Sequence, residues 1–579
     1  MARRLVVDPV TRIEGHLRLE ATLDADNTIT EAYSSGTMVR GIEKILVGRD
    51  PREAWALAQR VCGVCTLVHA VASVRAVENA LAIAIPRAAD IMRNMMIAQQ
   101  FVHDHVMHFY HLHALDWVDV VSALSADPAA TAALQKSLSS WHNNTAAYFA
   151  DVKAKLQGLA DSGNLSLFGN AYWGHPGYKL PAEVNLLAVA HYLEALDWQI
   201  DATRVHVLLG GKNPHPNFVV GGVAMPIDMK SRSALNQKKL DAMKQSIDDM
   251  VAFVDQVYLP DALAVASYYK EYATIGGGTQ DFLTWGEFPG DDPTQPSSVL
   301  VPRGLIRNRD LSTVIEPSPL DEQRLKELVA HSWYSYAGGN DEGLHPFNGQ
   351  TSLNYTGPQP PYDQLNVDKE YSWLKSPRWD GSAAEVGPLS RVLVMYASGH
   401  AQTRDLVATS LTSLGLPQAA LFSALGRTLA RALETKVFVD ALNRYHGDLV
   451  AAIRAGETAT FNKAKWDPKT WPATARGVGT AEAPRGALGH WMTIENGKVA
   501  NYQMVVPTTW NASPRDAAGN PGPYELALKG VQLAVPDQPL EILRVVHSFD
   551  PCMGCAVHVT DAQGEHVGEA RSGLNVTLR

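Results

Sequence analysis

The sequence predicts a mainly α, α+β fold, in which a large helical bundle forms the core and small antiparallel hairpins and peripheral loops surround it. Three observations predict it. Apolar residues recur at three- and four-residue spacing over residues 51–272 and 400–454. Short alternating runs flank turn-forming residues near both ends of the chain. A stretch rich in proline, glycine and aromatic residues, 284–377, separates the two helical regions.

The first predicted element is a hairpin near the N-terminus. Residues 17–23 alternate apolar and polar side chains, and the turn-forming Asp24–Asn27 segment follows them. The helical region then begins at about Pro51, with spacings such as that of Ile91 and Met95. We therefore expect a bundle of long helices over this first half of the chain.

The central stretch contains too many prolines for long regular elements. We expect wrapping loops around one short helix, opened by Ser318–Pro319. Within the second helical region, residues 406–426 contain the breaker 415–417, which predicts two helices meeting at a turn and not a membrane span. Asn496–Gly497, set between alternating residues, predicts a second hairpin.

Composition excludes some classes of function. The chain has 579 residues, with 50 Lys and Arg against 60 Asp and Glu, a net charge of −10 and no long basic run. Nucleic acid is therefore not expected as a partner. Arg3–Arg4 is followed by Asp8 and Pro9 before an apolar segment of signal-peptide length can form. We expect no export signal of the chain's own.

The four cysteines form two C-x-x-C pairs, Cys62 with Cys65 and Cys552 with Cys555, separated by most of the chain. Two thiols at this spacing can bind one metal ion. Three interpretations remain open: a structural zinc site, a redox-active dithiol, and a catalytic site in which four soft sulfurs hold a transition metal such as nickel or iron. Against the first, a zinc site usually closes a small module. Against the second, a redox-active dithiol usually lies near a βαβ unit, and we find none in the sequence.

At these cysteines the chain resembles the large subunit of nickel-iron hydrogenases. Each pair is followed by a histidine, His69 or His558, and further matching segments cover most of the length. These segments are residues 12–16, 36–43, 210–217, 482–486 and 505–511. Segments 173–176, 192–199 and 214–217 look most like the membrane-bound uptake branch.

The resemblance implies a nickel-iron centre. All four sulfurs would bind nickel, with Cys62 and Cys552 terminal and Cys65 and Cys555 also bridging to an iron that carries carbon monoxide and cyanide. Splitting dihydrogen at such a centre sends a proton to a terminal sulfur, Cys552, and then to a nearby carboxylic acid. Glu14 is the candidate for that acid, although its residue type alone favours a surface pair with Arg12.

The other catalytic assignments surround that centre. Arg485 matches an arginine over the open face of the metals, and its alternative is a surface cation after Pro484. Asp104 and Asp550 match acids that offset the burial of this arginine. Thr508 matches a position that hydrogen-bonds a cyanide.

A second metal site and several histidines complete the assignments. Glu43, the backbone carbonyl of Met504 and His558 match the ligands of a magnesium or iron ion near the C-terminus. His69 is expected to hydrogen-bond a bridging sulfur. The histidines between residues 103 and 113 are expected to be core or subunit-contact residues, because their spacing does not place four imidazoles on one helix face.

The resemblance also implies processing and partners. A maturation endopeptidase would cleave between His558 and Val559, so that residues 1–558 form one catalytic domain and 559–579 are a propeptide. All cysteines are used at the nickel site, so electrons would leave through an iron-sulfur small subunit to cytochrome b and quinone. The small subunit would export both chains to the outer face of the cell membrane, as a peripheral heterodimer. The alternative is a zinc-stabilised structural or quinone-module subunit.

Overall fold

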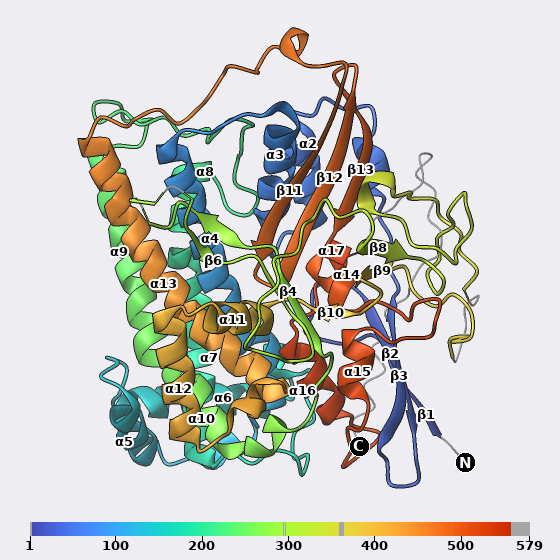
Figure 1. The fold of residues 1–579 in the computed structure, drawn as a ribbon. Helices are drawn as coiled ribbons and strands as arrows, with labels where there is room; N and C mark the ends of the chain where they lie inside the picture. Colours follow the sequence, from blue (N-terminus) through green and yellow to red (C-terminus); the bar gives the residue numbers. More distant parts are fainter. Residues whose placement is uncertain (1–2, 293, 296, 358–363, 557–579) are drawn as a thin grey trace.

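The computed structural model describes residues 3–292, 294–295, 297–357 and 364–556, and it combines a helical bundle with five small sheets (Figure 1). Helices α4, α7, α9 and α13 lie against one another in the bundle. The helices longer than ten residues are α3 (Val68–Leu81), α4 (Arg87–Met107), α5 (Pro128–Leu138), α6 (Ala146–Asp161), α7 (Ala182–Ala202), α9 (Gln237–Phe253), α12 (Ala401–Leu414) and α13 (Ala424–Arg454).

Shorter helices complete the helical part of the fold, and α14 contacts α17 next to the second cysteine pair. These are α1 (Ile42–Leu46), α2 (Ala54–Ala58), α8 (Arg204–Gly210), α10 (Leu259–Tyr268), α11 (Pro388–Ala397), α14 (Pro507–Asn511), α15 (Pro523–Leu528), α16 (Leu540–Ser548) and α17 (Met553–Ala556). The fold is therefore a mixture of helix and strand in which the helices form the larger layer (Figure 1).

Most strand pairs are antiparallel, and each sheet has two or three strands. One sheet contains β1 (Arg3–Val7), β2 (Leu17–Leu23) and β3 (Ile29–Gly36), and another contains β11 (Thr474–Ala483), β12 (Gly486–Glu495) and β13 (Lys498–Val505). The smaller ones join β4 (Asp281–Thr284) to β7 (Gly304–Ile306) and β10 (Ala384–Glu385), β5 (Glu287–Pro289) to β6 (Val299–Val301), and β8 (Leu325–Leu328) to β9 (Ser376–Trp379).

Both predicted hairpins are confirmed, and each gains a third strand. Strands β2 and β3 pair around the Asp24–Thr28 turn, and β1 pairs with β2 on the other side. Strands β12 and β13 are joined by Asn496 and Gly497, which both have positive φ, as a tight two-residue hairpin requires. Strand β11 pairs with β12 over its whole length.

The two helices predicted within residues 406–426 are α12 and α13. Gly415, at φ 64°, ends α12 in the left-handed conformation. The hydroxyl of Ser423 accepts the backbone N–H of Gly426 and so caps the start of α13. Elsewhere, the helical run Gln237–Tyr268 is long and apolar enough to cross a membrane, and half of its most apolar window is buried inside the fold.

The prediction of a short helix opened by Ser318–Pro319 is wrong, because the structure has a turn there. The backbone N–H of Asp321 bonds to the Ser318 carbonyl, and the Ser318 hydroxyl accepts the N–H of Leu320, which makes a turn. Strand β8 begins at Leu325, too soon after this turn for a helix to form, and it is held by its pairing with β9. Tertiary pairing therefore overrides the local helix-start signal.

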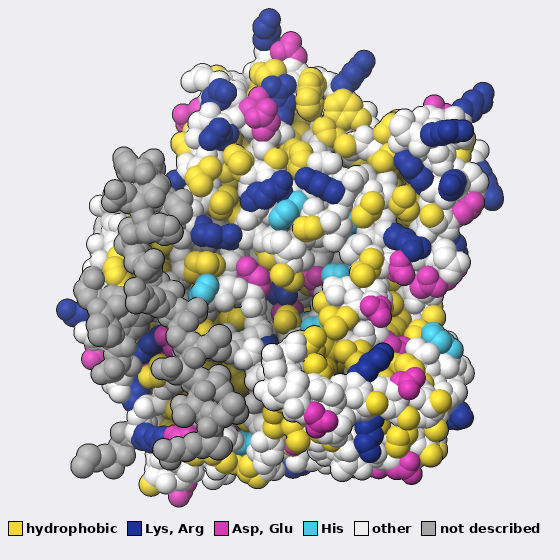
Figure 2. Space-filling model, turned by 180° about the vertical axis from the view of Figure 1, so that it is seen from behind, with side chains coloured by type: hydrophobic (Ala, Val, Ile, Leu, Met, Phe, Trp, Pro, Cys, Tyr) yellow, Lys and Arg dark blue, Asp and Glu magenta, His cyan; other side chains and the backbone are white. Residues whose placement is uncertain are grey.

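Strand β11 lies directly on helix α3, and this contact positions the candidate site. A Cβ at Gly479 would lie 1.9 Å from the carbonyl oxygen of Ala72, so only glycine permits this approach. Helix α3 follows the first cysteine pair, and β11 leads into Arg485. The face of the molecule opposite to that of Figure 1 carries apolar side chains mixed with positively and negatively charged ones (Figure 2).

Candidate metal centre

Cysteines from opposite ends of the chain converge in the interior. The Sγ atoms of Cys62 and Cys552 are 3.4 Å apart, and those of Cys62, Cys65 and Cys552 all lie within 4.8 Å of one another. All three side chains are buried. The side chain of Cys555 lies outside the described residues, so its place in this set stays a prediction.

The donor set fits a soft metal ion. The sulfurs of Cys62 and Cys552 are too far apart for a disulfide, which needs about 2.0 Å. A tetrahedral ion with bonds of about 2.3 Å to sulfur separates its ligands by roughly 3.8 Å. The sulfurs here, 3.4 Å apart for Cys62 and Cys552 and all within 4.8 Å, are close to that separation. Cys62 and Cys65 face the same point because the 62–65 backbone turns, and the Cys65 N–H lies 3.3 Å from the Cys62 Sγ. Buried thiolates in this arrangement suit nickel, iron or zinc.

Glu14 is placed beside the C-terminal thiol. Its backbone carbonyl accepts the N–H of Met553, and its carboxylate Oε2 accepts the N–H of Gly554 at 2.6 Å. The Sγ of Cys552 lies 3.3 Å from Oε2. Burial, with a smaller effect of Cys62, raises the pKa of the Glu14 carboxyl. The alternative prediction, a surface ion pair between Glu14 and Arg12, is wrong, because Arg12 instead pairs with the buried Asp116.

Arg485 is a buried cation and not a surface residue, since its side chain is 3% exposed. It occupies the turn between β11 and β12. Its Nη1 lies 3.3 Å from Asp104 Oδ2 on α4, and its Nη2 lies 2.9 Å from Asp550 Oδ1. Although burial opposes its charge, Asp550 and Cys552 raise the pKa of this guanidinium well above its usual value. The structure therefore brings together Arg485 and both predicted partners.

Thr508 is also at the site. Its hydroxyl oxygen accepts the N–H of Cys552 at 3.1 Å, which leaves its own proton for donation. One ring nitrogen of His69 has a protein partner, because its Nδ1 lies 3.0 Å from Nε2 of His490. Burial lowers the pKa of His69 to about 4, so the ring is neutral. A bond from His69 to a bridging sulfur stays a prediction.

The predicted magnesium ligands are only partly described. Glu43 is buried on α1, where its Oε1 accepts the Met504 N–H at 2.8 Å and its Oε2 accepts the Thr351 hydroxyl. Glu43 and Met504 are therefore neighbours, as the prediction requires. His558 and Val559 lie outside the described residues, so neither the third ligand nor the cleavage site is tested.

Two residues that hold the site together carry no signal in a single sequence. The guanidinium of Arg40 donates to the carbonyls of Val61 and Gly554, so it joins the two cysteine segments. Gly554 lies so close to Glu14 that a Cβ there would come within 2.1 Å of the carboxylate. Arg40 lies in residues 36–43, one of the segments that resemble nickel-iron hydrogenases, but only the fold shows what it contacts.

The histidines between residues 103 and 113 do not share one metal. His105 bonds Glu434, His108 bonds a backbone carbonyl, and His113 bonds Asp116. This agrees with core residues. His113 does form a buried group with Asp116 and His547, but Asp116 already pairs with Arg12, and Trp117 donates to His113 Nε2. That group is therefore an internally satisfied polar cluster.

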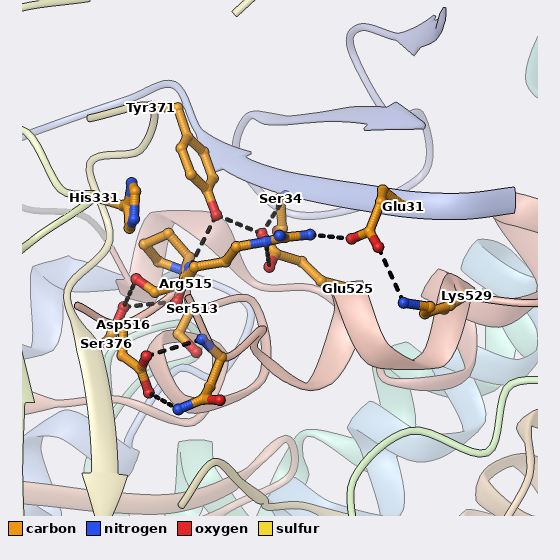
Figure 3. Close-up of polar contacts among 12 residues, drawn as sticks. Glu31, Ser34, His331, Tyr371, Ser376, Ser513, Arg515, Asp516, Glu525 and Lys529 are labelled. Atoms are coloured by element: carbon orange, nitrogen blue, oxygen red, sulfur yellow. Dashed lines mark hydrogen bonds and ion pairs between the residues drawn. The ribbon is translucent and has the colours of Figure 1, made fainter. Parts of the chain in front are cut away.

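A second polar network attaches the C-terminal segment to the N-terminal sheet (Figure 3). Glu525 on α15 accepts the Ser34 N–H at 3.0 Å and the Tyr371 hydroxyl at 2.8 Å through one oxygen. Arg515 pairs with Glu31 of β3. Burial raises the pKa of Glu525 to about 7. Helix α15 is thus fixed to β3 through Glu525.

The contribution of Glu525 to the free energy of unfolding is expected to fall as pH rises from about 4.5 to about 7, because native Glu525 holds its proton where the unfolded chain has lost it. The Glu525→Gln variant lacks this titration. Its stability relative to the parent should rise across that window, by up to about 3 kcal/mol. Chemical denaturation of both proteins at pH 5 and pH 8 measures the difference, and a pH-independent difference would contradict the assignment.

Comparisons with known proteins agree with this site. The profile described as nickel-dependent hydrogenase matches residues 40–558, and a second, HoxL-like, matches residues 4–35. The uptake hydrogenase large subunit of Bradyrhizobium diazoefficiens is 50% identical over 98% of this chain and 97% of its own length. The hydrogenase-1 large chain of Escherichia coli is 47% identical over 98% and 96%.

Solved structures show the same fold. The Ni-Fe-Se hydrogenase from Desulfovibrio vulgaris Hildenborough in the reduced state superposes with a TM-score of 0.75 at 30% identity, covering 96% of this chain and 100% of that chain. The anaerobically purified enzyme of Desulfomicrobium baculatum gives 0.74 at 30% identity with the same coverage. The chain belongs to the nickel-dependent hydrogenase family.

Proposed function

We propose that this chain is the catalytic large subunit of an uptake hydrogenase, which splits dihydrogen into protons and electrons. The observation that carries this is the convergence of Cys62, Cys65 and Cys552 beside Glu14 and Arg485. A nickel-iron pair bound by the thiolates, with carbon monoxide and cyanide on the iron, supplies the Lewis acidity and redox capacity that the reaction requires. The thiolates of Cys62, Cys65, Cys552 and Cys555 would hold this centre.

The residues of the chain manage the proton. The Cys552 sulfur accepts it, and Glu14 receives it across the 3.3 Å that separates Sγ from Oε2. Gly554 fixes the carboxylate by its N–H, which leaves the other oxygen for onward transfer. Arg485, held by Asp104 and Asp550, presents a fixed positive charge toward the thiols. Thr508 retains a hydroxyl proton for a cyanide.

Electrons leave through a partner, which we propose is an iron-sulfur small subunit that passes them to cytochrome b and quinone. The names of the relatives as uptake hydrogenases support this direction. We further propose that the small subunit exports the pair to the outer face of the membrane, where the heterodimer is peripheral. A magnesium or iron ion bound by Glu43, the Met504 carbonyl and His558 would stabilise the C-terminal segment.

Metal content tests the proposed function. Nickel should be present in proportion to the large subunit, together with infrared bands of iron-bound carbon monoxide and cyanide. Iron alone is uninformative, because the small subunit carries its own. The competing function, a zinc-stabilised structural or quinone-module subunit, predicts zinc without nickel and no such bands. That second result would overturn the proposal.

Processing gives an independent prediction. We propose that an endopeptidase cleaves between His558 and Val559, so that residues 1–558 remain as the catalytic domain and 559–579 are lost. The family profile match ends at residue 558, which supports this boundary. Intact mass spectrometry of active enzyme should find a large subunit ending at His558. An active enzyme that retains residues 559–579 would refute the cleavage.

A further inference from the structure

A second buried arginine, Arg391 on α11, lies next to the turn that presents Arg485. Its side chain is fully buried. Nε and Nη2 donate to the two carboxylate oxygens of Glu434, at 2.9 and 2.7 Å, and Nη1 donates to Glu482 at 2.9 Å. The remaining two N–H groups donate to the carbonyls of Ala483, at 2.8 Å, and Pro484, at 2.7 Å. All five donors of the guanidinium are therefore used.

The last two acceptors matter because they immediately precede Arg485. Glu482 and Ala483 are the last residues of β11 and Pro484 begins the turn after it, so one guanidinium holds three consecutive residues of this hairpin. The start of α11 packs against the same turn, since a Cβ at Gly486 would lie 2.6 Å from the N of Gly387. The backbone that leads into α11 therefore lies against the turn that carries Arg485.

The opposite side of Arg391 fixes the partner of Arg485. Glu434 on α13 also accepts Nε2 of His105 at 2.7 Å, and His105 follows Asp104 on α4. The ring of Phe101, one turn earlier on α4, lies 4.8 Å from the Arg391 guanidinium carbon. One buried cation thus joins the hairpin that carries Arg485 to the helix that carries Asp104.

A lysine at position 391 could not make all of these contacts. A buried guanidinium is stable only when its charge is offset, as Glu434 and Glu482 do here. A lysine ammonium keeps the charge but has three donors and no planar fork. At least two of the five acceptors would then lose their donor.

We propose that Arg391 is a positioning residue, which sets the place of the Arg485 guanidinium relative to Asp104 and the thiols. The inference rests on the proposed function, because it assigns Arg485 a role in dihydrogen splitting. Arg391 itself does not touch the thiols in any contact of the described residues. It acts through the backbone of Ala483 and Pro484.

The test compares Arg391→Lys with Arg93→Lys in the heterodimer. Arg93 is a matched control, because it is equally buried, pairs with both oxygens of Glu78 and donates to the Gly222 carbonyl at 2.8 Å, but holds a different turn. Arg391→Lys should lower kcat for hydrogen oxidation about 100-fold, the cost of a small misplacement, without loss of nickel. Its cyanide infrared bands should shift as those of Arg485→Lys do. Arg93→Lys should change neither quantity.

The double variant Arg391→Lys/Arg485→Lys separates positioning from general damage. If Arg391 acts through Arg485, the double variant should be no slower than Arg485→Lys alone. Multiplied losses, or unchanged cyanide bands in Arg391→Lys, would overturn the inference while leaving the proposed function intact. Full turnover by Arg485→Lys would instead remove the proposed role of Arg485, and the inference with it.

A second variant covers the case in which Arg391→Lys yields no nickel-loaded protein. Glu482→Gln leaves one side-chain oxygen where two now accept, one from Arg391 and one from the Trp285 N–H at 2.6 Å. It should show the same pattern of lower kcat, shifted cyanide bands and non-additivity with Arg485→Lys. Unchanged kcat and bands in nickel-loaded Glu482→Gln would overturn the inference.

Discussion

Replacing Cys62 by serine is expected to remove nickel from the purified heterodimer, and hydrogen oxidation with it. The thiol of Cys62 lies 3.4 Å from that of Cys552, so both can bind the same metal ion. A serine hydroxyl remains protonated near neutral pH, and its hard oxygen is a poor ligand for nickel. Loss of a direct ligand should weaken binding by more than the 10- to 100-fold that loss of an outer-shell partner costs.

Elemental analysis and dye reduction by hydrogen measure the two effects on the same preparation. Activity should fall in proportion to nickel. Val64→Ala is the matched control, since Val64 lies in the same loop but its side chain is 41% exposed and holds no donor atom. A Cys62→Ser enzyme with full nickel and full activity would show that this thiol is not a ligand.

The chemistry of the site was readable from sequence because it depends on residue type. Thiols at C-x-x-C spacing restrict the site to metals or redox chemistry before any fold is known. The identity of the metal and the roles of Glu14 and Arg485 needed the family resemblance. By residue type alone both were surface charges, and only the fold shows that Arg12 pairs with Asp116 and leaves Glu14 facing Cys552.

The fold was predictable where local signals and packing agree. The Asn496–Gly497 hairpin and the break at Gly415 follow from backbone conformations that those residues favour. The Ser318–Pro319 signal failed because β8 pairs with β9 instead. Arg40 and Arg391 were beyond prediction for another reason: each holds backbone carbonyls far away in sequence, and no periodicity records such contacts.

The Glu14→Gln variant is expected to keep nickel and lose turnover. Glutamine preserves the shape of the side chain and can still accept the Gly554 N–H, but it cannot take up a proton. Hydrogen oxidation should fall by about 10²- to 10⁴-fold, the usual contribution of a positioned acid or base. Exchange of hydrogen with deuterium from the solvent should fall by a similar factor, because it needs the same proton transfer.

Two further variants distinguish a proton relay from a packing role. Glu14→Asp keeps an acid but withdraws it from the Cys552 sulfur, now 3.3 Å away, so an intermediate loss is expected. Glu31→Gln alters a carboxylate on strand β3 that pairs with Arg515 and Lys529, and should keep full turnover. Equal losses in Glu14→Asp and Glu14→Gln would favour packing, whereas unchanged turnover and exchange in Glu14→Gln would move the proton path elsewhere. Because burial raises the pKa of Glu14, its carboxyl can hold a proton closer to neutral pH than an exposed glutamate, as a relay between a thiol and solvent must.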